Sequence, residues 1–365
     1  MANKTARLGD LATYINGYAF KPADWGDTGL PIIRIQDLTG NSYQLNRYDG
    51  EYPERIEVND GDVLISWSAS LGVYVWQRGK ALLNQHIFKV VFDKLPINKD
   101  YFVFAVEHKL AEMESKTHGA TMKHIVKKDF DGTTIPYPSS EKQAEIADHL
   151  RRITSLIDRQ TEQLLLLDQL VKSRFIELFG DPLIEDDRYP RVPLGSLAEV
   201  GSSKRIFEKE YVSEGIPFYR TKEIVELSKG NRITTELFIT KERYDEIRSE
   251  YGAPQKGDLL ISAVGTIGVI WIVDGKNDFY FKDGNLLRVS ATEKFVPEYL
   301  KHLLEALISA YKSEMSSGTA YAALTISALK EMMVYDVPHA EQEQFAAFVE
   351  QTDKSKLCGK MEVAA

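Results

Sequence analysis

The chain has 365 residues, of which 43% are hydrophobic and 27% are charged, and its formal net charge is −9. This length exceeds that of a typical single domain, and the composition excludes a disordered tail or linker protein. The acidic total excludes a uniformly basic nucleic-acid binder, although DNA binding depends on the charge of one face rather than on the sum. The single cysteine, Cys358, excludes an internal disulfide and a cysteine-based zinc site.

Targeting and cofactor signals are missing from the sequence. The longest strongly apolar stretch, residues 261–273, is shorter than the ~20 residues that a membrane span needs. Residues 1–17 mix Lys, Arg and Asp without an apolar run, so we expect no secretory signal and a cytoplasmic location. No phosphate loop of the G-x-x-x-x-G-K-[ST] type occurs, and no cofactor is expected.

An internal repeat organises the chain. Residues 29–34 (GLPIIR) return as residues 215–220 (GIPFYR), and residues 61–66 (GDVLIS) return in the same order as residues 257–262 (GDLLIS). The order is kept while the spacing between matches drifts. Two copies of one domain with different loop lengths explain this pattern.

Each copy combines predicted strands with a predicted helix. Short runs of β-branched and aromatic residues, bounded by Gly, Pro, Asp or Asn, predict the strands. In residues 100–113 and 298–315, apolar residues recur at helical spacing. We therefore expect an α+β fold with two similar domains of mixed α and β structure, at residues 1–140 and 181–339.

Residues 141–180 between the copies predict a long coiled-coil helix. Residues 141–179 contain no Gly or Pro, and their apolar residues follow an alternating four-three spacing. At 1.5 Å per residue such a helix spans roughly 58 Å, which favours a spacer that seeks a partner over a surface helix of one domain. The residues of this helix seam are Ile146, Leu150, Ile153, Ile157, Leu164, Leu167, Val171 and Leu178.

Residues 340–365 begin a second helix of the same kind and end near Leu357, so we expect it to be truncated relative to the first. The seam between Leu164 and Leu178 should then be unpaired. An exposed apolar seam favours self-association or the binding of a partner helix.

Polar side chains follow the predicted strands in both copies. Asn and Gln pair bidentately with adenine in the major groove, and Arg and Lys pair with guanine. Any single residue of this kind is more often a turn or cap residue, so the prediction of DNA contacts depends on the group. The group comprises Arg34, Gln36, Ser66, Ser68, Ser70, Asn84, Gln85 and His86 in the first copy, and Lys204, Arg220, Lys222, Thr266, Lys282, Asp283 and Asn285 in the second.

A basic loop adds candidate phosphate contacts. Residues 115–128 contain four lysines and two histidines and no acid, which suits phosphate oxygens better than a neutral turn would. Its candidate residues are Lys116, Thr117, His118, Thr121, Lys123 and His124. The matching loop of the second copy, with Ser317, Thr319 and Tyr321, keeps the hydroxyl groups and loses the charge.

Two rival functions stay open at this point. Asp258, Asp274 and Lys276 could form a metal-dependent nuclease site, because a D…D-x-K arrangement on adjacent strands can hold a divalent metal. Residues 274–276 are also a simple hairpin turn, and the two histidines of the basic loop lack a metal-ligand spacing, so no metal site is expected. A coiled-coil adaptor that binds only proteins would leave the polar strand ends without a role.

The chain resembles a known family in several segments: GLPIIR at 29–34, GDVLIS at 61–66, GAT at 119–121 with PYP at 136–138, EKQAEIA at 141–147 and FIELFGDP at 175–182. Together these segments, and the order domain, helix, domain, helix, resemble the specificity subunits of type I restriction-modification enzymes over nearly the whole chain. The resemblance implies two target recognition domains, each of which reads one half of a bipartite, asymmetric DNA sequence. It also implies two long helices that pair antiparallel, hold the domains apart and dock methyltransferase subunits, which restriction subunits join. The specificity subunit itself would perform no chemistry.

Overall fold

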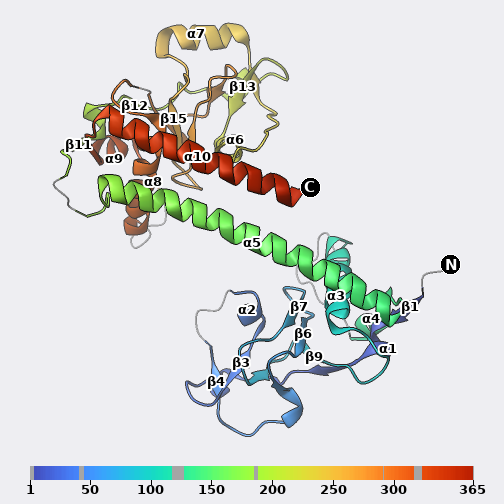
Figure 1. The fold of residues 1–365 in the computed structure, drawn as a ribbon. Helices are drawn as coiled ribbons and strands as arrows, with labels where there is room; N and C mark the ends of the chain where they lie inside the picture. Colours follow the sequence, from blue (N-terminus) through green and yellow to red (C-terminus); the bar gives the residue numbers. More distant parts are fainter. Residues whose placement is uncertain are drawn as a thin grey trace. The chain divides into compact units, whose positions relative to one another are not determined.

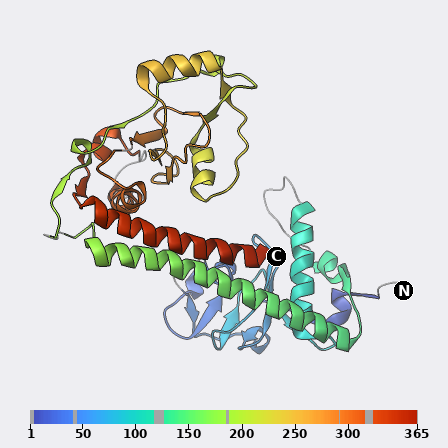
Figure 2. The ribbon, with the colours of Figure 1, turned by 45° about the horizontal axis from the view of Figure 1, so that its top comes forward.

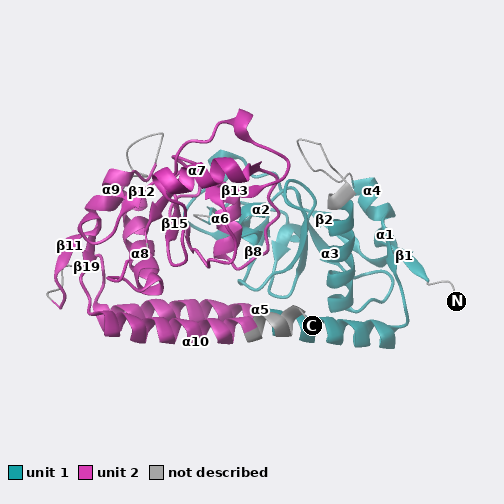
Figure 3. Cartoon of the chain, turned by 90° about the horizontal axis from the view of Figure 1, so that it is seen from above, with its two compact units in different colours: residues 1–158 teal, residues 159–365 magenta. Residues whose placement is uncertain are grey.

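The computed structural model describes residues 4–40, 45–116, 127–184, 188–290, 292–315 and 323–364. Figure 1 shows its helices and strands. The chain forms two compact units, Met1–Asp158 and Arg159–Ala365, which Figure 3 colours separately. Within the described ranges, none of the helices combines the length and the apolar character that crossing a membrane requires.

Two four-stranded sheets form the centre of the first unit. One sheet is antiparallel and has the order β2 (Thr13–Asn16), β9 (Ile87–Val91), β6 (Val63–Ser66) and β7 (Gly72–Val75). The other has the order β4 (Arg47–Tyr48), β3 (Leu30–Ile33), β8 (Ala81–Leu83) and β5 (Glu57–Val58), and its β3 and β8 are parallel. Short elements and helices surround the sheets: β1 (Thr5–Arg7), α1 (Leu8–Leu11), η1 (Pro22–Asp24), α2 (Ile35–Leu38), η2 (Glu54–Ile56), α3 (Lys99–Lys116), α4 (Lys127–Gly132) and β10 (Thr134–Pro136).

Strand β6 is buried along its length, and its first three residues are apolar, because it lies between two hydrophobic cores. Val63 and Ile65 point into a core that includes Phe102 of α3, whereas Leu64 points into the other core with Ile32 of β3. Successive side chains of a strand face opposite sides, so one run of four residues serves both cores.

The second unit repeats this arrangement. Its antiparallel sheet has the order β12 (Val200–Gly201), β18 (Leu286–Val289), β15 (Leu259–Ser262) and β16 (Ile270–Ile272). Its other sheet has the order β14 (Phe238–Ile239), β13 (Ile216–Tyr219) and β17 (Tyr280–Phe281), with β13 and β17 parallel. The remaining elements are β11 (Arg191–Pro193), η3 (Leu194–Ser196), η4 (Glu208–Glu210), α6 (Thr221–Ser228), α7 (Lys241–Tyr251), α8 (Pro297–Met315), α9 (Ile326–Glu331) and β19 (Met333–Tyr335). The prediction of two similar domains of mixed α and β structure is confirmed.

Two long helices accompany these units. Helix α5 covers Ser140–Phe179, shifted by one residue from the predicted 141–180, and α10 covers His339–Ala364. Within the second unit the two run antiparallel and side by side (Figure 2). The ring of Phe175 lies 5.3 Å from that of Phe345, and Asp168 forms a 2.8 Å ion pair with Lys356, so the residue numbers run in opposite directions along the contact.

The prediction that the seam between Leu164 and Leu178 is unpaired is wrong. Val171 is only 3% exposed and shares a core with Phe345 and Val349 of α10, and Leu178 packs against the same core. Antiparallel pairing places the start of α10 beside the end of α5, so even a short second helix covers this part of the seam. The other seam residues range from half-buried, at Ile146, Leu150, Leu164 and Leu167, to 53% and 44% exposed at Ile153 and Ile157.

Candidate nucleic-acid interface

The parallel strands of the first unit place predicted site residues side by side. Because Ile33 of β3 lies opposite Leu83 of β8, the next residues, Arg34 and Asn84, leave the sheet at the same edge. The backbone N–H of Asn84 donates to the carbonyl of Ile33 at 3.1 Å. Beyond Asn84, Gln85 is exposed. We call residues 34–37, 66–70 and 84–86 the first edge.

A buried acid holds Arg34 at this edge. The carboxylate of Asp37 accepts a 2.7 Å hydrogen bond from the backbone N–H of Arg34 and lies 3.6 Å from its guanidinium Nε. The guanidinium also lies 5.6 Å from the ring of Trp25. A buried carboxylate next to a guanidinium fixes the direction of the planar donor group. Arg34 and Asp37 therefore form an ion pair directly after the buried strand β3, and this pair positions the guanidinium.

The first edge carries the strained backbone of the described chain. Ala69 and His86 have φ angles of 61° and 73°, a region that residues other than glycine rarely adopt. The ring of His86 packs against that of Trp67 at 5.0 Å, and the hydroxyl of Ser66, at the end of β6, donates to the carbonyl of Ser68 at 3.3 Å. Backbone strain of this kind concentrates at functional sites.

The second unit has an equivalent edge. Tyr219 of β13 lies opposite Phe281 of β17, so Arg220 and Lys282 leave the sheet together, and the backbone N–H of Lys282 donates to the carbonyl of Tyr219 at 2.9 Å. The buried carboxylate of Glu223 accepts hydrogen bonds from the backbone N–H of Arg220 at 2.8 Å and from its Nη2 at 3.2 Å. We call residues 220–223, 263–266 and 282–285 the second edge.

A cavity of about 610 Å³ opens beside Thr221, the residue directly after Arg220. Lys222 and Thr266 line it together with Glu223, so the second edge brings two of the predicted residues together around one hollow. Asp283, next to Lys282, accepts a 2.6 Å hydrogen bond from Nε of Arg205. Three cationic side chains, those of Arg220, Lys222 and Lys282, therefore lie on this edge, and the buried Glu223 orients that of Arg220.

Further predicted residues lie around the edges in structural or less defined roles. The backbone carbonyl of Asn285 accepts from the N–H of Ala263 at 2.8 Å, and Nζ of Lys204 lies 4.6 Å from the ring of Tyr251 on α7. Gln36 is exposed on α2 and Ser70 is exposed in the turn before β7. Thr117, His118, Thr121, Lys123, His124, Ser317, Thr319 and Tyr321 lie outside the described residues, as does the side chain of Lys116.

Buried polar atoms without a hydrogen-bond partner in the described chain gather at both edges. On the first edge they include Oδ1 of Asp37 and Nδ1 of His86. On the second edge they are Nε of Arg220, Oγ1 of Thr221 and Oδ1 of Asp283. Leaving such an atom unpaired costs about 1–3 kcal/mol, so their concentration at two equivalent places indicates surfaces that meet a polar ligand.

Comparison with known proteins decides the family. The model of the type I restriction modification DNA specificity domain matches residues 2–167 and 188–359, once for each unit. The chain belongs to this family. Each matched range contains one of the two edges, so we refer to the units as the first and second specificity domains.

Relatives and solved structures agree with this assignment. The specificity subunit of the type I restriction enzyme EcoBI from Escherichia coli is 24% identical over 94% of this chain and 78% of its own length. A putative type I restriction enzyme specificity subunit from Haemophilus influenzae is 29% identical over 78% of this chain and 72% of its length. The crystal structure of the S subunit of a type I restriction-modification system from M. genitalium, 15% identical, covers 99% of this chain and 92% of that chain with a TM-score of 0.58 and shows the same fold.

The residues of the proposed nuclease site form turns in the second specificity domain. Oδ1 of Asp274 accepts a 3.0 Å hydrogen bond from the backbone N–H of Lys276, and Asp258 accepts from the N–H of Gln255 at 2.9 Å. Among the residues that the structure describes, no three His, Cys, Asp or Glu side chains are grouped as metal ligands would be. Asp274 and Lys276 thus fit the hairpin-turn interpretation.

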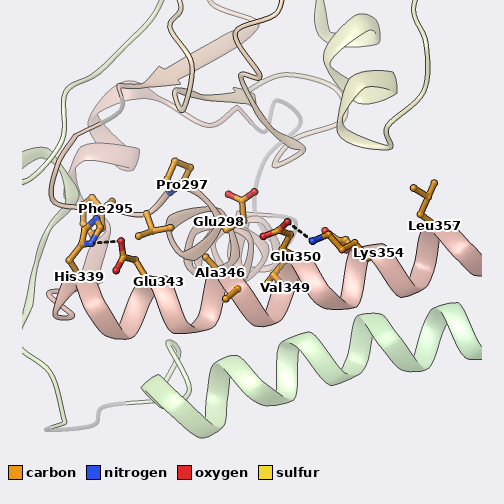
Figure 4. A pocket seen from close by; sticks show the side chains of 13 residues that line it. Phe295, Pro297, Glu298, His339, Glu343, Ala346, Val349, Glu350, Lys354 and Leu357 are labelled. Atoms are coloured by element: carbon orange, nitrogen blue, oxygen red, sulfur yellow. Dashed lines mark ion pairs between the residues drawn. The ribbon is translucent and has the colours of Figure 1, made fainter.

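A separate hollow of about 800 Å³ runs along α10 in the second specificity domain (Figure 4). Glu298, Glu343, Glu350 and Asp353 line it together with apolar residues of α8 and α10, and Glu350 forms a 2.7 Å ion pair with Lys354. An acidic lining repels phosphate groups. This surface therefore suits a protein partner better than DNA.

Sequence reasoning missed the aromatic residues of the first edge. Trp25 is 42% exposed beside Arg34, and Trp67 donates from Nε1 to Oδ1 of Asn16 at 3.3 Å. Trp25 directly follows the short helix η1 and has no periodic neighbours. The sequence signal that could have marked it is its place in a polar turn, where a large aromatic side chain has no core to join.

Proposed function

We propose that the chain reads a bipartite, asymmetric DNA target for a type I restriction-modification complex, with one half of the target read by each specificity domain. The observation that carries this proposal is the repetition of one edge with unequal side chains. On both edges an arginine at the end of one parallel strand binds a buried acid and lies next to the end of the other strand. Both edges also contain buried polar atoms without a hydrogen-bond partner in the described chain. Two similar readers with different chemistry suit a target whose halves differ.

The division of labour follows from the positions of the polar groups. Side chains on the edges discriminate bases, because amides and guanidinium groups match the donor and acceptor patterns of the major groove. The lysines of residues 115–128 contact phosphates and add affinity without sequence preference. In a bacterium the DNA lies in the cytoplasm, so the proposal places the protein in that compartment.

Partner subunits complete the complex in this proposal. The relatives are specificity subunits of restriction enzymes, which supports docking of methyltransferase subunits and, through them, of restriction subunits. The acidic hollow along α10 and the exposed Ile153 and Ile157 of α5 offer helix surfaces for such contacts. The chain would then perform no chemistry, and its net charge of −9 predicts weak, salt-sensitive DNA binding in the absence of partners.

Mapping of methylated sites tests the proposal. The chain is co-expressed with the methyltransferase subunit of its own system in a host without other methylation, and the methylated positions are sequenced. We expect one motif of two specified halves, and no such motif when either subunit is expressed alone. Metal-dependent DNA cleavage by the purified chain, or the same motif without the chain, would contradict the proposal.

A further inference from the structure

We infer that the two domains read different kinds of base: Gln85 of the first edge pairs with adenine, and Arg220 of the second edge pairs with guanine. This inference rests on the proposed function and adds the class of base in each half of the target. It follows from a comparison of equivalent positions on the two edges, one step at a time.

The two arginines occupy equivalent positions but are presented differently. Arg34 and Arg220 each follow a parallel strand and each bind an acid three residues on. The side chain of Arg34 is only 16% exposed, whereas that of Arg220 is 34% exposed. Arg34 is therefore recessed, and Arg220 is the more accessible reader.

The aromatic residue that follows the short helix before each strand explains this difference. In the first domain, Trp25 follows η1 and lies 5.6 Å from the guanidinium of Arg34. In the second, Tyr211 follows η4 and its ring packs against Phe218 at 5.3 Å. Tyr211 packs against the core instead, so its ring does not cover the guanidinium of Arg220 as Trp25 covers that of Arg34. A guanidinium oriented by Glu223 and accessible to solvent can present two N–H groups to O6 and N7 of guanine.

The turn that follows β8 in the first domain also differs from the turn that follows β17 in the second domain. Here the first domain has the side chain that suits base reading. In the first domain it reads Asn84-Gln85-His86 and carries uncharged amides, whereas the second domain has KDGN at residues 282–285. Oδ1 of Asn84 accepts a 2.9 Å hydrogen bond from the backbone N–H of Gln85, and that same N–H lies 2.9 Å from the carbonyl of Tyr18. The backbone of Gln85 is thus fixed while its side chain is exposed.

The conformation of His86 supports a selected geometry in this turn. His86 has a φ of 73°, close to the 70° of Gly284 in the corresponding turn of the second domain. The first domain keeps a strained histidine where the second uses a glycine, which needs no strain. This strained turn presents Gln85, whose amide can donate to N7 and accept from N6 of adenine.

Sequencing of methylated sites with four variants tests the inference. Gln85→Ala and Arg220→Ala are compared with two control variants, Gln77→Ala and Lys276→Ala. The controls change exposed residues in the turns that precede β8 and β17, away from the two edges. A bidentate pair discriminates by about 1–3 kcal/mol, which converts to about 5- to 140-fold at 1.4 kcal/mol per tenfold. We expect Gln85→Ala to lower preference for an adenine in one half by that factor, and Arg220→Ala to do so for a guanine in the other half. Both controls should keep the motif.

Arg220→Gln is a second variant at this position, and it should produce a new base preference instead of a loss of preference. It should shift the preferred base at the affected position from guanine towards adenine. The inference is overturned if Arg220→Ala relaxes an adenine or thymine, if both variants relax the same half, or if both keep the motif. It is also overturned if Arg220→Ala and Arg220→Gln abolish methylation while gel filtration shows an intact complex. A wild-type chain that directs no motif contradicts the proposed function instead.

Discussion

Gln143 and Gln342 are buried at the same place in the two specificity domains and make the same hydrogen bond. Oε1 of Gln143 accepts from the backbone N–H of Asn98 at 2.9 Å, and Oε1 of Gln342 accepts from that of Val296 at 2.8 Å. Each glutamine lies in the first turn of a long helix and joins it to the residue directly before helix α3 or α8. The domains thus share the connection between reading module and helix as well as their sheets.

Replacement of Gln342 should destabilise the second domain. Nε2 of Gln342 also donates to the carbonyls of Lys294 and Val337, at 3.1 and 2.8 Å. Gln342→Ala leaves these backbone groups without their partner, so we expect the free energy of unfolding to fall by about 1–3 kcal/mol. Denaturant unfolding measures this, with the exposed Gln344→Ala as the control. Equal unfolding midpoints for the two variants would contradict the structural role of Gln342.

The stability of the second domain should depend on Tyr244 at alkaline pH. Burial, together with the charge of Asp278, raises the pKa of Tyr244 from 10 to about 12. The unfolded chain therefore loses this proton at a lower pH than the folded chain, and the contribution to stability is complete below pH 10 and lost as the pH rises towards 12.

Tyr244→Phe removes the titration and isolates this effect. Between pH 9 and pH 11.5 we expect the free energy of unfolding of the wild type to fall by about 2 kcal/mol more than that of the variant. Urea unfolding at the two pH values measures the difference, and Tyr251→Phe, at an exposed position, is the control. A parallel decrease in all three proteins would show that Tyr244 does not titrate differently on unfolding.

The sequence predicts those parts of the fold whose pattern is local. Strand β6 is recognisable because burial on both faces makes residues 63–65 continuously apolar, and α5 because a four-three spacing continues from residue 146 to residue 178 without Gly or Pro. The places of Arg34, Asn84, Arg220 and Lys282 directly after strands were predictable for the same reason, whereas Gln36 and Lys222 lie on the short helices α2 and α6. Duplication strengthened each of these predictions.

Long-range contacts were not predictable from such patterns. The burial of Val171 depends on α10 running antiparallel to α5, and the direction of pairing leaves no mark on the spacing of either helix. The recessed position of Arg34 depends on Trp25, which approaches across a turn. Helix α7 carries few buried residues, so its sequence shows only a weak apolar stripe.

Binding to phosphate should be separable from base reading. Lys123, in the basic segment 115–128, is predicted to contact a phosphate, and Gln85 is predicted to contact a base. Lys123→Ala should weaken binding of the assembled complex to all sequences alike and reduce the slope of log K against log salt by about 1. Gln85→Ala should leave that slope unchanged. Binding titrations at several salt concentrations, on target and non-target duplexes, distinguish these outcomes, and equal losses on every sequence for both variants would refute the assignment.

The length of α5 should set the unspecified gap between the two halves of the target. Seven residues inserted after Leu164 add about 10.5 Å at 1.5 Å per residue, with little net rotation because seven residues are close to two turns. The insertion precedes Asp168, Val171 and Phe175, so their contacts with α10 are retained. We expect the gap to lengthen by at most about 3 base pairs, at 3.4 Å each, while both halves keep their sequence. Sequencing of methylated sites measures the gap, and an insertion of seven residues after Lys276, in the exposed turn between β16 and β17, is a control that leaves α5 intact. Retained methylation with an unchanged gap would show that α5 does not set the spacing.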